Sequence, residues 1–251
     1  MNKRNKISSY NFLTASWEYL AMFNYEVDPA ILVKHLPPYT EIDYFKGKAL
    51  VSIVGFLFNN TKVGNIKWPG HVNFEEVNLR YYVRHHDGIQ WKRGVGFVSE
   101  IVPKPLIAGM ANLLYNEHYS TAKMEHRIIE KADNLFVEYG WKKRNKLRNV
   151  IRINATPELQ DVEISSEEEF IFEHYFGYNK FNGTSTVEYA VQHPRWKVYP
   201  IKNFSIDCDI ENLYGKEFVP CILNKQPHSV FLARGSSVTV KLPLKIKGSK
   251  K

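Results

Sequence analysis

Glutamate, asparagine, arginine and tyrosine side chains alternate with apolar ones in the segment 73–86. Because neighbouring side chains of a β-strand point to opposite faces, Glu76, Asn78, Arg80 and Tyr82 would share one face of a strand here. A carboxyl group on this row could act as a general acid or base, and the guanidinium could hold a carboxylate through two parallel hydrogen bonds. The row either lines a polar cavity or faces bulk water. Periodicity alone favours bulk water, because most alternating strands have one solvated face.

A second group of polar residues lies where a buried helix is expected to pass into a strand, in the run from Tyr115 to Tyr119. Polar residues at the end of an element are well placed for a site. Histidine titrates near neutral pH, so His118 could transfer protons, with Tyr115, Asn116 and Tyr119 contacting a ligand. In the alternative interpretation the two tyrosines pack and Asn116 to His118 only cap the helix.

The run His193-Pro194-Arg195-Trp196 is a further candidate for ligand contact through His193 and Trp196. Proline at this point indicates a bend in the chain. The alternative is that Trp196 is a packed aromatic residue, which is the commoner use of tryptophan.

Common catalytic motifs are absent from the sequence. The chain has no phosphate-binding loop ending in Gly-Lys-Ser/Thr, no Gly-x-Ser-x-Gly and no His-Glu-x-x-His. His85 and His86 are adjacent and would point apart in a strand, and no acid or thiol has metal-ligand spacing to them. The sequence therefore predicts neither a metal site nor a cofactor.

Apolar residues at every second position, with turn residues between the runs, predict strands over most of the chain. Hairpins are expected to turn at Lys46-Gly47 and at Asp87-Gly88. A strand at 48–58 is apolar on both faces and should be central in its sheet. The expected strands cover 13–27, 41–45, 48–58, 73–86, 89–102, 119–129, 135–141, 149–155, 178–191, 195–207 and 229–242.

Helices are expected at three places. Asp28-Pro29 should begin a short one, because aspartate caps free N–H groups and proline suits the first turn. A second helix is expected over 105–115, and a third over 167–175, where Ser166 and Glu169 have capping-box spacing. The expected inward stripe of the second helix consists of Leu106, Met110, Leu113 and Leu114.

The 251 residues contain no Pro/Gly/Ser-rich linker and no repeat, so one domain is expected over 1–251, with frayed termini at 1–10 and 244–251. The strand pattern and an aromatic content of 14% predict a mainly β (α+β) fold: a closed or nearly closed antiparallel barrel covered by two or three helices. The sequence has no signal peptide and no 18-residue apolar run, and Cys208 and Cys221 form no disulfide framework. These features predict a cytoplasmic protein with no membrane partner.

The net charge of +8 raises the question of nucleic-acid binding. Lysine and arginine are spread along the chain, however, and only Lys142–Arg148 and the tail after Lys245 are locally basic. No nucleic-acid-binding module is recognisable, so nucleic acid is not the expected partner.

Six segments make the chain resemble a known family. The sequence resembles the YqjF-like family, a group of bacterial proteins of unassigned function related to acetoacetate decarboxylase. The resemblance implies an acetoacetate decarboxylase-like barrel with an internal cavity, possible assembly into homo-oligomers, and a Glu76 row that faces the cavity. The segments run in order over most of the chain: 24–29, 51–56, 73–80, 100–103, 114–119 and 193–196.

Decarboxylases of the related superfamily use a Schiff-base lysine whose pKa a second lysine depresses. Aligning their helix with 105–115 places those two lysines at Tyr119 and Ser120, and the nearest lysine here is Lys123. The relatives also carry an arginine in the first strand region, but 14–26 has neither arginine nor lysine. Acetoacetate decarboxylase activity is therefore not expected.

Three functions remain open from the sequence. The first is binding of a small polar or carboxylate-bearing molecule in the barrel cavity. The second is an enzyme of another kind, in which Glu76 is the general base, Arg80 clamps a carboxylate, and His118 or Tyr115 donates the second proton. The third is nucleic-acid binding through Lys142–Arg148. Whether the chain is an enzyme stays undecided.

Overall fold

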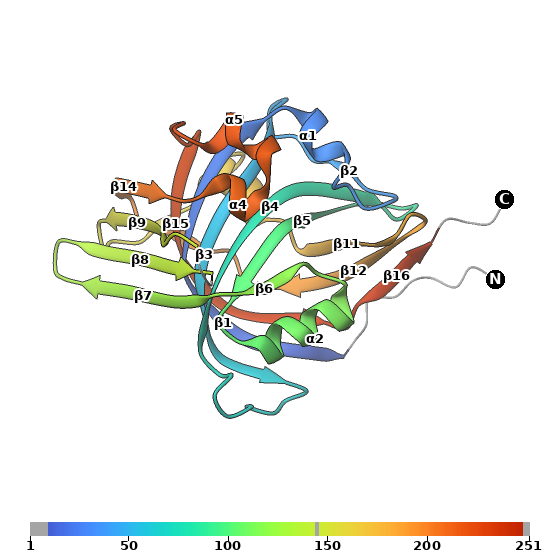
Figure 1. Cartoon of the computed structure of the whole chain (residues 1–251), viewed down its shortest axis with the longest axis horizontal. Coiled ribbons are helices and arrows are strands. Elements are labelled where there is room, and N and C mark those ends of the chain that lie inside the picture. The colour runs from blue at the N-terminus through green and yellow to red at the C-terminus, as the bar shows by residue number, and fades with distance from the viewer. Residues whose placement is uncertain (1–9, 144–145, 248–251) are drawn as a thin grey trace.

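The computed structural model describes residues 10–143 and 146–247, and their strands form two sheets (Figure 1). The larger sheet has twelve strands: β1 (Asn11–Val27), β2 (Glu41–Ile42), β3 (Ala49–Val63), β4 (Phe74–His86), β5 (Trp91–Val102), β6 (Tyr119–Thr121), β10 (Gln160–Asp161), β11 (Phe176–Asn182), β12 (Ser185–Gln192), β13 (Lys197–Val198), β15 (Ser229–Lys241) and β16 (Leu244–Lys247). The smaller sheet has four: β7 (Lys123–Glu130), β8 (Leu135–Lys142), β9 (Asn149–Ala155) and β14 (Ile201–Asp207).

Seven strands of the larger sheet follow one another and return to the first, in the order β15-β1-β3-β4-β5-β11-β12. The closing contact between β12 and β15 is short and consists of two residue pairs, Val191 with Val240 and Gln192 with Thr239. Most neighbours in the ring are antiparallel, and β5 and β11 pair in parallel. The prediction of a mainly β fold with a nearly closed sheet is confirmed.

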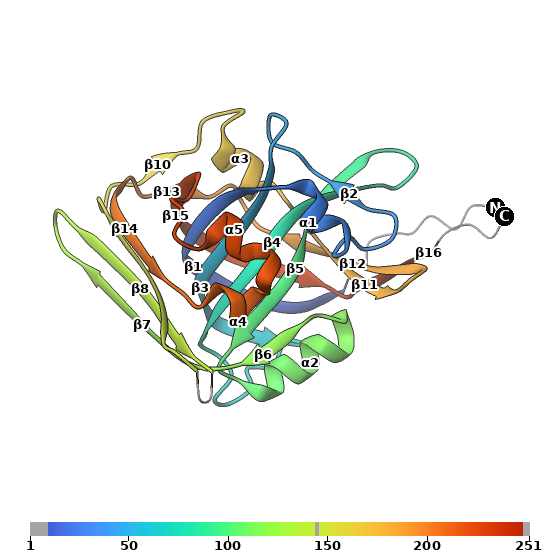
Figure 2. The ribbon, with the colours of Figure 1, turned by 45° about the horizontal axis from the view of Figure 1, so that its top comes forward.

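Strand β4 lies in the middle of this ring and is buried on both faces. Its odd-numbered face, which carries Val77, Leu79, Tyr81 and Val83, belongs to an apolar core shared with the smaller sheet. Figure 2 shows the smaller sheet lying against the larger one. The even-numbered face carries Glu76, Asn78 and Arg80, all of them buried as well. A polar row on a strand with no solvated face must line an internal space.

Two β-bulges change which residues face that space. In β1, Tyr19 has a positive φ of 52°, and the pairing with β3 shifts between Glu18 and Ala21. In β5, Val98 is the extra residue, because Leu79 pairs with Ser99 and Arg80 pairs with Phe97. One extra residue reverses the alternation of faces beyond it. Phe97 and Glu100 therefore face the same side of the sheet, despite their odd spacing.

The three expected helices all form. Asp28 accepts a hydrogen bond from the Ala30 N–H and caps α1 (Pro29–Val33), and α2 spans Pro105–Tyr115 as predicted. Ser166 caps α3 (Glu167–Phe172) by accepting from the Glu169 N–H at 3.1 Å. Short helical segments that the pattern did not predict precede β15: α4 (Ile210–Tyr214), a 3₁₀ turn (Lys216–Phe218) and α5 (Val219–Ile222). None of the helices in 10–143 and 146–247 has the length and apolar character needed to span a bilayer.

The predicted inward stripe of α2 is wrong for its three leucines. Leu106 and Leu113 are 70% and 83% exposed, and Leu114 is exposed as well. Met110 does line the internal cavity, together with Ile107, Ala111 and Tyr115. The side of α2 that faces inward is therefore determined by its packing against β5 and β6 and not by which residues are most apolar.

Other local expectations also differ from the structure. The single strands expected over 119–129, 178–191 and 195–207 each form two strands. Strand β2 pairs with β4 rather than with β3, although Phe45 and Lys48 do bridge the predicted Lys46-Gly47 turn. The β4–β5 hairpin pairs His86 with Trp91, so its turn has four residues and not two. Residues 244–247 are not frayed, because they form β16 and pair with β12.

Candidate functional site

A cavity of about 120 Å³ lies inside the nearly closed sheet, with α2 along one side. One buried water needs only about 10–15 Å³ measured in this way, so the space admits a small molecule. Most of the lining is apolar, and the polar groups come mainly from β4, β5 and the connection between α2 and β6.

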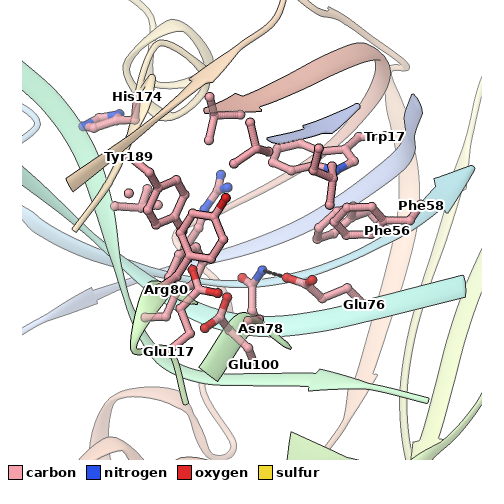
Figure 3. A pocket seen from close by; sticks show the side chains of 18 of the residues that line it. Trp17, Phe56, Phe58, Glu76, Asn78, Arg80, Glu100, Glu117, His174 and Tyr189 are labelled. Carbon is pink, nitrogen blue, oxygen red and sulfur yellow. Dashed lines mark hydrogen bonds between the residues drawn. The ribbon is translucent and has the colours of Figure 1, made fainter. Parts of the chain in front are cut away.

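The polar row of β4 faces the cavity (Figure 3), so the solvent-facing alternative is wrong. Glu76 is 3% exposed, and both of its carboxyl oxygens accept hydrogen bonds. Asn78 Nδ2 donates to Oε1 at 2.9 Å and the Tyr119 hydroxyl donates to Oε2 at 2.8 Å. Because partners from the same strand and from β6 hold it, the carboxyl group has a fixed orientation.

Two more carboxyl groups complete an acidic cluster of Glu76, Glu100 and Glu117, all lining the cavity (Figure 3). Glu100 lies on β5 directly opposite Asn78. Glu117 lies between α2 and β6, and it accepts a hydrogen bond from the Tyr189 hydroxyl at 2.5 Å. Within the acidic cluster, each carboxyl group comes from a different segment of the chain.

The acidic cluster holds its protons more tightly than carboxyl groups in water do. Burial raises the pKa of Glu76 to about 7, against the hydrogen bonds from Asn78 and Tyr119. Burial also raises the pKa of Glu117 to about 8. The pKa of Glu100 is raised well above its usual value, first by burial and then by the charges of Glu117 and Glu76. Groups this close titrate together, so near neutral pH the cluster shares protons.

Arg80 supplies the one arginine or lysine charge among the described residues that line the cavity. Its side chain has no carboxylate partner within salt-bridge distance there; its contacts are the Met22 sulfur at 3.5 Å and the Tyr82 ring at 5.6 Å. Its Nε–H has no hydrogen-bond partner in the described part of the chain. A buried cation without a partner is costly, so this guanidinium is free to bind an anion.

Two acceptors beside Arg80 also lack partners. Asn78 Oδ1 and Glu100 Oε2 are buried and make no hydrogen bond within residues 10–143 and 146–247. Most buried polar atoms in folded proteins are hydrogen-bonded, so three unsatisfied atoms at one place call for an explanation. A ligand that offers both donors and acceptors would satisfy them.

An aromatic wall lies beside Glu76, because Phe56 and Phe58 are on the neighbouring strand β3 and Phe56 pairs with Glu76. Trp17 lies 5.2 Å from Phe56 and 5.6 Å from Phe58, measured between ring centroids, and Phe58 stacks on Phe74 at 4.7 Å. Trp196 continues this wall from Trp17, and His193 stacks on Trp196 at 4.1 Å. Such a surface suits a flat or branched apolar group.

His174 lines another part of the cavity and is almost inaccessible to solvent. Its Nε2 lies 3.1 Å from Asp43 Oδ2, and its Nδ1 has no partner among the described residues. Burial lowers the pKa of His174 to about 4, so the ring is neutral at pH 7. Burial alone would raise the pKa of Asp43, but hydrogen bonds from His174 and Arg93 outweigh it and lower that pKa. With Nε2–H directed at Asp43, Nδ1 is an acceptor.

The structure brings most of the predicted site residues together and leaves three outside. The residues that line the cavity are Glu76, Asn78, Arg80, Tyr115, Tyr119, His193 and Trp196. Tyr82 is buried behind the row, with its hydroxyl 2.6 Å from Ser52 Oγ. Asn116 has a left-handed backbone and donates to the Lys180 carbonyl, and His118 is exposed. His118 therefore does not reach the cavity in which it was expected to transfer protons.

Sequence reasoning missed Glu100 and Glu117. Alternation along β5 gives no reason to place Glu100 beside Phe97, because the bulge at Val98 is not visible in the residue pattern. Glu117 follows Asn116, whose positive φ of 53° ends α2 and turns the chain inward. Asparagine just after a helix is the one sequence signal that could have pointed to this turn.

The basic segment Lys142–Arg148 was a further candidate. Arg148 pairs with Glu125 at 2.8 Å and with Glu138 at 3.4 Å, so part of its charge is neutralised. Lys146 donates to the Asn212 side chain. Residues 144 and 145 lie outside the described residues.

The fold of the chain resembles that of several solved acetoacetate decarboxylase-like structures. The structure matches an acetoacetate decarboxylase from Legionella pneumophila (13% identity, TM-score 0.58, covering 99% of this chain and 92% of that one). It also matches an acetoacetate decarboxylase-like enzyme from Sphingomonas wittichii RW1 (10% identity, TM-score 0.62, covering 96% and 95%). A third match is the enduracididine biosynthesis enzyme MppR, complexed with the condensation product of pyruvate and imidazole 4-carboxaldehyde (12% identity, TM-score 0.62, covering 94% and 89%). At these identities the likeness shows the fold alone.

The chain belongs to the DUF2071 family, described as uncharacterised conserved proteins, whose model matches residues 14–237. No significant match was found among curated proteins. Tyr119 lines the cavity at the start of β6, whereas Ser120 is not among the lining residues, and no lysine is among the described residues that line the cavity.

Proposed function

We propose that the protein binds a small polar molecule in this cavity, and that a carboxylate on the molecule pairs with Arg80. The single observation that carries the proposal is a buried guanidinium with no carboxylate partner in the described chain, inside an enclosed space. A ligand carboxylate would supply the missing counter-charge and accept from Arg80. The MppR complexes with pyruvate and with a pyruvate condensation product support small ligands within this fold.

A thermal-shift screen of small acids, amines, alcohols and amides tests the proposal. A ligand present at 100 times its Kd stabilises the native state by about 2.7 kcal/mol, which is readily measured. Arg80→Met should lose the stabilisation. The matched control is Arg84→Met on the same strand, because Arg84 lies outside the cavity and pairs with Glu41. If no compound class stabilises the protein, the binding proposal fails.

The second candidate function is acid–base catalysis by Glu76. The specific observation that favours it is a carboxyl pKa of about 7 beside a second proton donor, the Tyr119 hydroxyl. General acids and bases work best when their pKa lies near the working pH. No imine step is included, because no lysine is among the described residues lining the cavity.

Glu76→Gln tests this second candidate and keeps the shape of the side chain. Turnover of any substrate found by the screen should be abolished, whereas binding measured by thermal shift should remain. Unchanged turnover in Glu76→Gln would remove Glu76 from the mechanism. A bound compound that the wild type never turns over would leave the first candidate alone.

A further inference from the structure

We infer that the ligand is a zwitterionic amino acid with an apolar, preferably aromatic, side chain. The inference rests on the proposed binding function and names the class of ligand. Its basis is a set of buried unpaired polar atoms beside an aromatic wall in one cavity. On β4 and β5 these atoms are the Arg80 Nε–H, Asn78 Oδ1 and Glu100 Oε2, and elsewhere in the lining they are the Trp17 Nε1–H and His174 Nδ1.

The unpaired atoms of β4 and β5 are ordered along these two neighbouring strands. Asn78 Oδ1 and Glu100 Oε2 come from residues directly opposite each other on β4 and β5. The Arg80 Nε–H comes from two positions further along the same face of β4, about 6.6 Å away in backbone distance. A ligand must therefore present a donor to the two acceptors and, beside it, an acceptor to the guanidinium.

A plain carboxylic acid satisfies only half of this arrangement. Its carboxylate would pair with Arg80 but would leave Asn78 Oδ1 and Glu100 Oε2 without a donor. A plain amine would pair with the acids and leave Arg80 unmatched. A zwitterion pairs both ends and brings no net charge into a buried space.

The aromatic part of the cavity lining determines which kind of ligand side chain fits. Trp17, Phe56 and Phe58 line the cavity beside Glu76 and away from Glu117 in Figure 3. Aromatic rings prefer edge-to-face or offset contacts with other rings. A charged or strongly polar side chain would lose its hydration against this wall. The inferred class is therefore an amino acid of the phenylalanine or leucine kind.

Isothermal titration calorimetry with three compounds that share one phenyl group tests the inference. L-Phenylalanine carries both charges, 3-phenylpropanoate only the negative one, and 2-phenylethylamine only the positive one. We expect L-phenylalanine to bind at least tenfold more tightly than either of the others. Equal or tighter binding of the acid or of the amine would overturn the zwitterion inference and leave the proposed binding function standing. Failure of all three would also overturn it, and the wider thermal-shift screen then decides the proposed function separately.

Two variants separate the contributions of the two charges. Arg80→Met should weaken L-phenylalanine and 3-phenylpropanoate at least tenfold and leave 2-phenylethylamine unchanged. Glu100→Gln, which keeps the side-chain shape, should weaken L-phenylalanine and 2-phenylethylamine at least tenfold and leave the acid unchanged or bound more tightly. Circular dichroism checks that both variants fold. Equal losses for every compound in either variant would contradict the inference, because a loss of structure weakens all three alike.

Discussion

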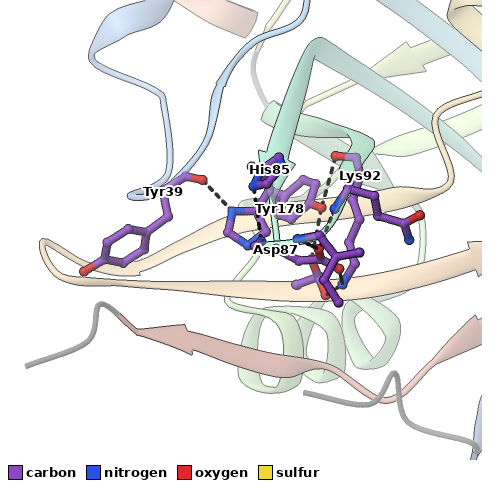
Figure 4. A network of polar contacts seen from close by, with 10 residues as sticks. Tyr39, His85, Asp87, Lys92 and Tyr178 are labelled. Atoms are coloured by element: carbon purple, nitrogen blue, oxygen red, sulfur yellow. Dashed lines mark hydrogen bonds and ion pairs between the residues drawn. The ribbon is translucent and has the colours of Figure 1, made fainter. Parts of the chain in front are cut away.

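Strand β5 contributes to two buried polar networks that handle charge in opposite ways. Near its start, Lys92 lies 3.0 Å from Glu188 and 3.5 Å from Asp87, and the Tyr178 hydroxyl donates to Glu188 at 3.0 Å (Figure 4). None of these polar side-chain atoms is among the unpaired ones. Near its end, Glu100 and the other described residues that line the cavity leave five buried polar atoms unpaired: Trp17 Nε1, Asn78 Oδ1, Arg80 Nε, Glu100 Oε2 and His174 Nδ1. The first network is complete within the protein, and the second needs a further molecule.

This difference separates a buried network that stabilises the fold from buried groups that are candidates for ligand binding. A buried charge is tolerated when a partner and further hydrogen bonds compensate its lost hydration. The Lys92 network meets that condition with Glu188 on β12, Tyr178 on β11 and Asp87 in the turn before β5. Arg80 is also buried but meets no carboxylate within salt-bridge distance in the described chain, which is the reason for proposing that it binds a ligand.

The largest expected effect separates the two networks by stability. Lys92→Met should lower the free energy of unfolding by about 3–5 kcal/mol, because Glu188 would stay buried without its cation. Arg80→Met should cost less than about 1 kcal/mol or stabilise the protein, because no carboxylate loses a partner. Urea unfolding followed by circular dichroism measures both. A similar decrease in the free energy of unfolding for the two variants would contradict the proposed difference between the two networks.

The next largest effect is expected in the pH dependence of stability, to which the cavity residues contribute. The folded-state pKa values of Glu76 and Glu117, about 7 and about 8, exceed the unfolded value of 4.5, so the folded state holds more protons. Their contribution is complete below pH 4.5 and is lost as pH rises to 8, with a slope of at most about 1.4 kcal/mol per pH unit for each carboxyl group. His174 acts oppositely: its pKa is lowered to about 4, so its contribution is lost as pH falls below 6.5.

One variant separates the contribution of the three carboxyl groups to the pH dependence of stability from the contribution of His174. The triple change Glu76→Gln, Glu100→Gln and Glu117→Gln should flatten the decline between pH 5 and 8, as measured by urea unfolding at each pH. The difference between wild type and variant is the quantity to compare. A difference that does not vary with pH would show that the acidic cluster is ionised in the folded protein.

A smaller effect is expected from Gly177, which faces Tyr189 across β11 and β12. A Cβ atom added there would come within 2.1 Å of the Tyr189 ring. Gly177→Ala should destabilise the protein by about 1–3 kcal/mol through this overpacking and should weaken ligand binding by moving the Tyr189 hydroxyl away from Glu117. Gly183→Ala is the control, because nothing lies within 4 Å of its Cβ position. Equal stability and equal ligand binding in the two variants would show that Tyr189 can move without consequence.

The smallest expected effect concerns His118, which is exposed. His118→Ala should change stability by less than about 0.5 kcal/mol and leave the affinity for every ligand unchanged. Calorimetry with the tightest ligand measures this. A loss of binding would mean that the connection containing Glu117 and His118 rearranges around the ligand.

The sequence predicted the polar row and the α2 boundaries well because both depend on local pattern. Alternation over 73–86 needs only the period of a strand, and Pro105 marks the helix start. The cavity-facing side of α2 and the position of Glu100 could not be predicted. The first depends on where other strands leave space, and the second on a one-residue bulge at Val98. Both are decided by long-range packing.

The bulge at Val98 determines which side chains at the end of β5 face the cavity. A regular ladder that kept Val98 would shift the end of β5 by one position, carrying Glu100 toward the apolar layer between the sheets and Ile101 into the pocket. Deleting Val98 would instead leave Glu100 opposite Asn78, because Phe97, Ser99 and Glu100 would then alternate regularly. The presence of Glu100 in the cavity therefore depends on how the strand accommodates one residue that carries no chemistry of its own.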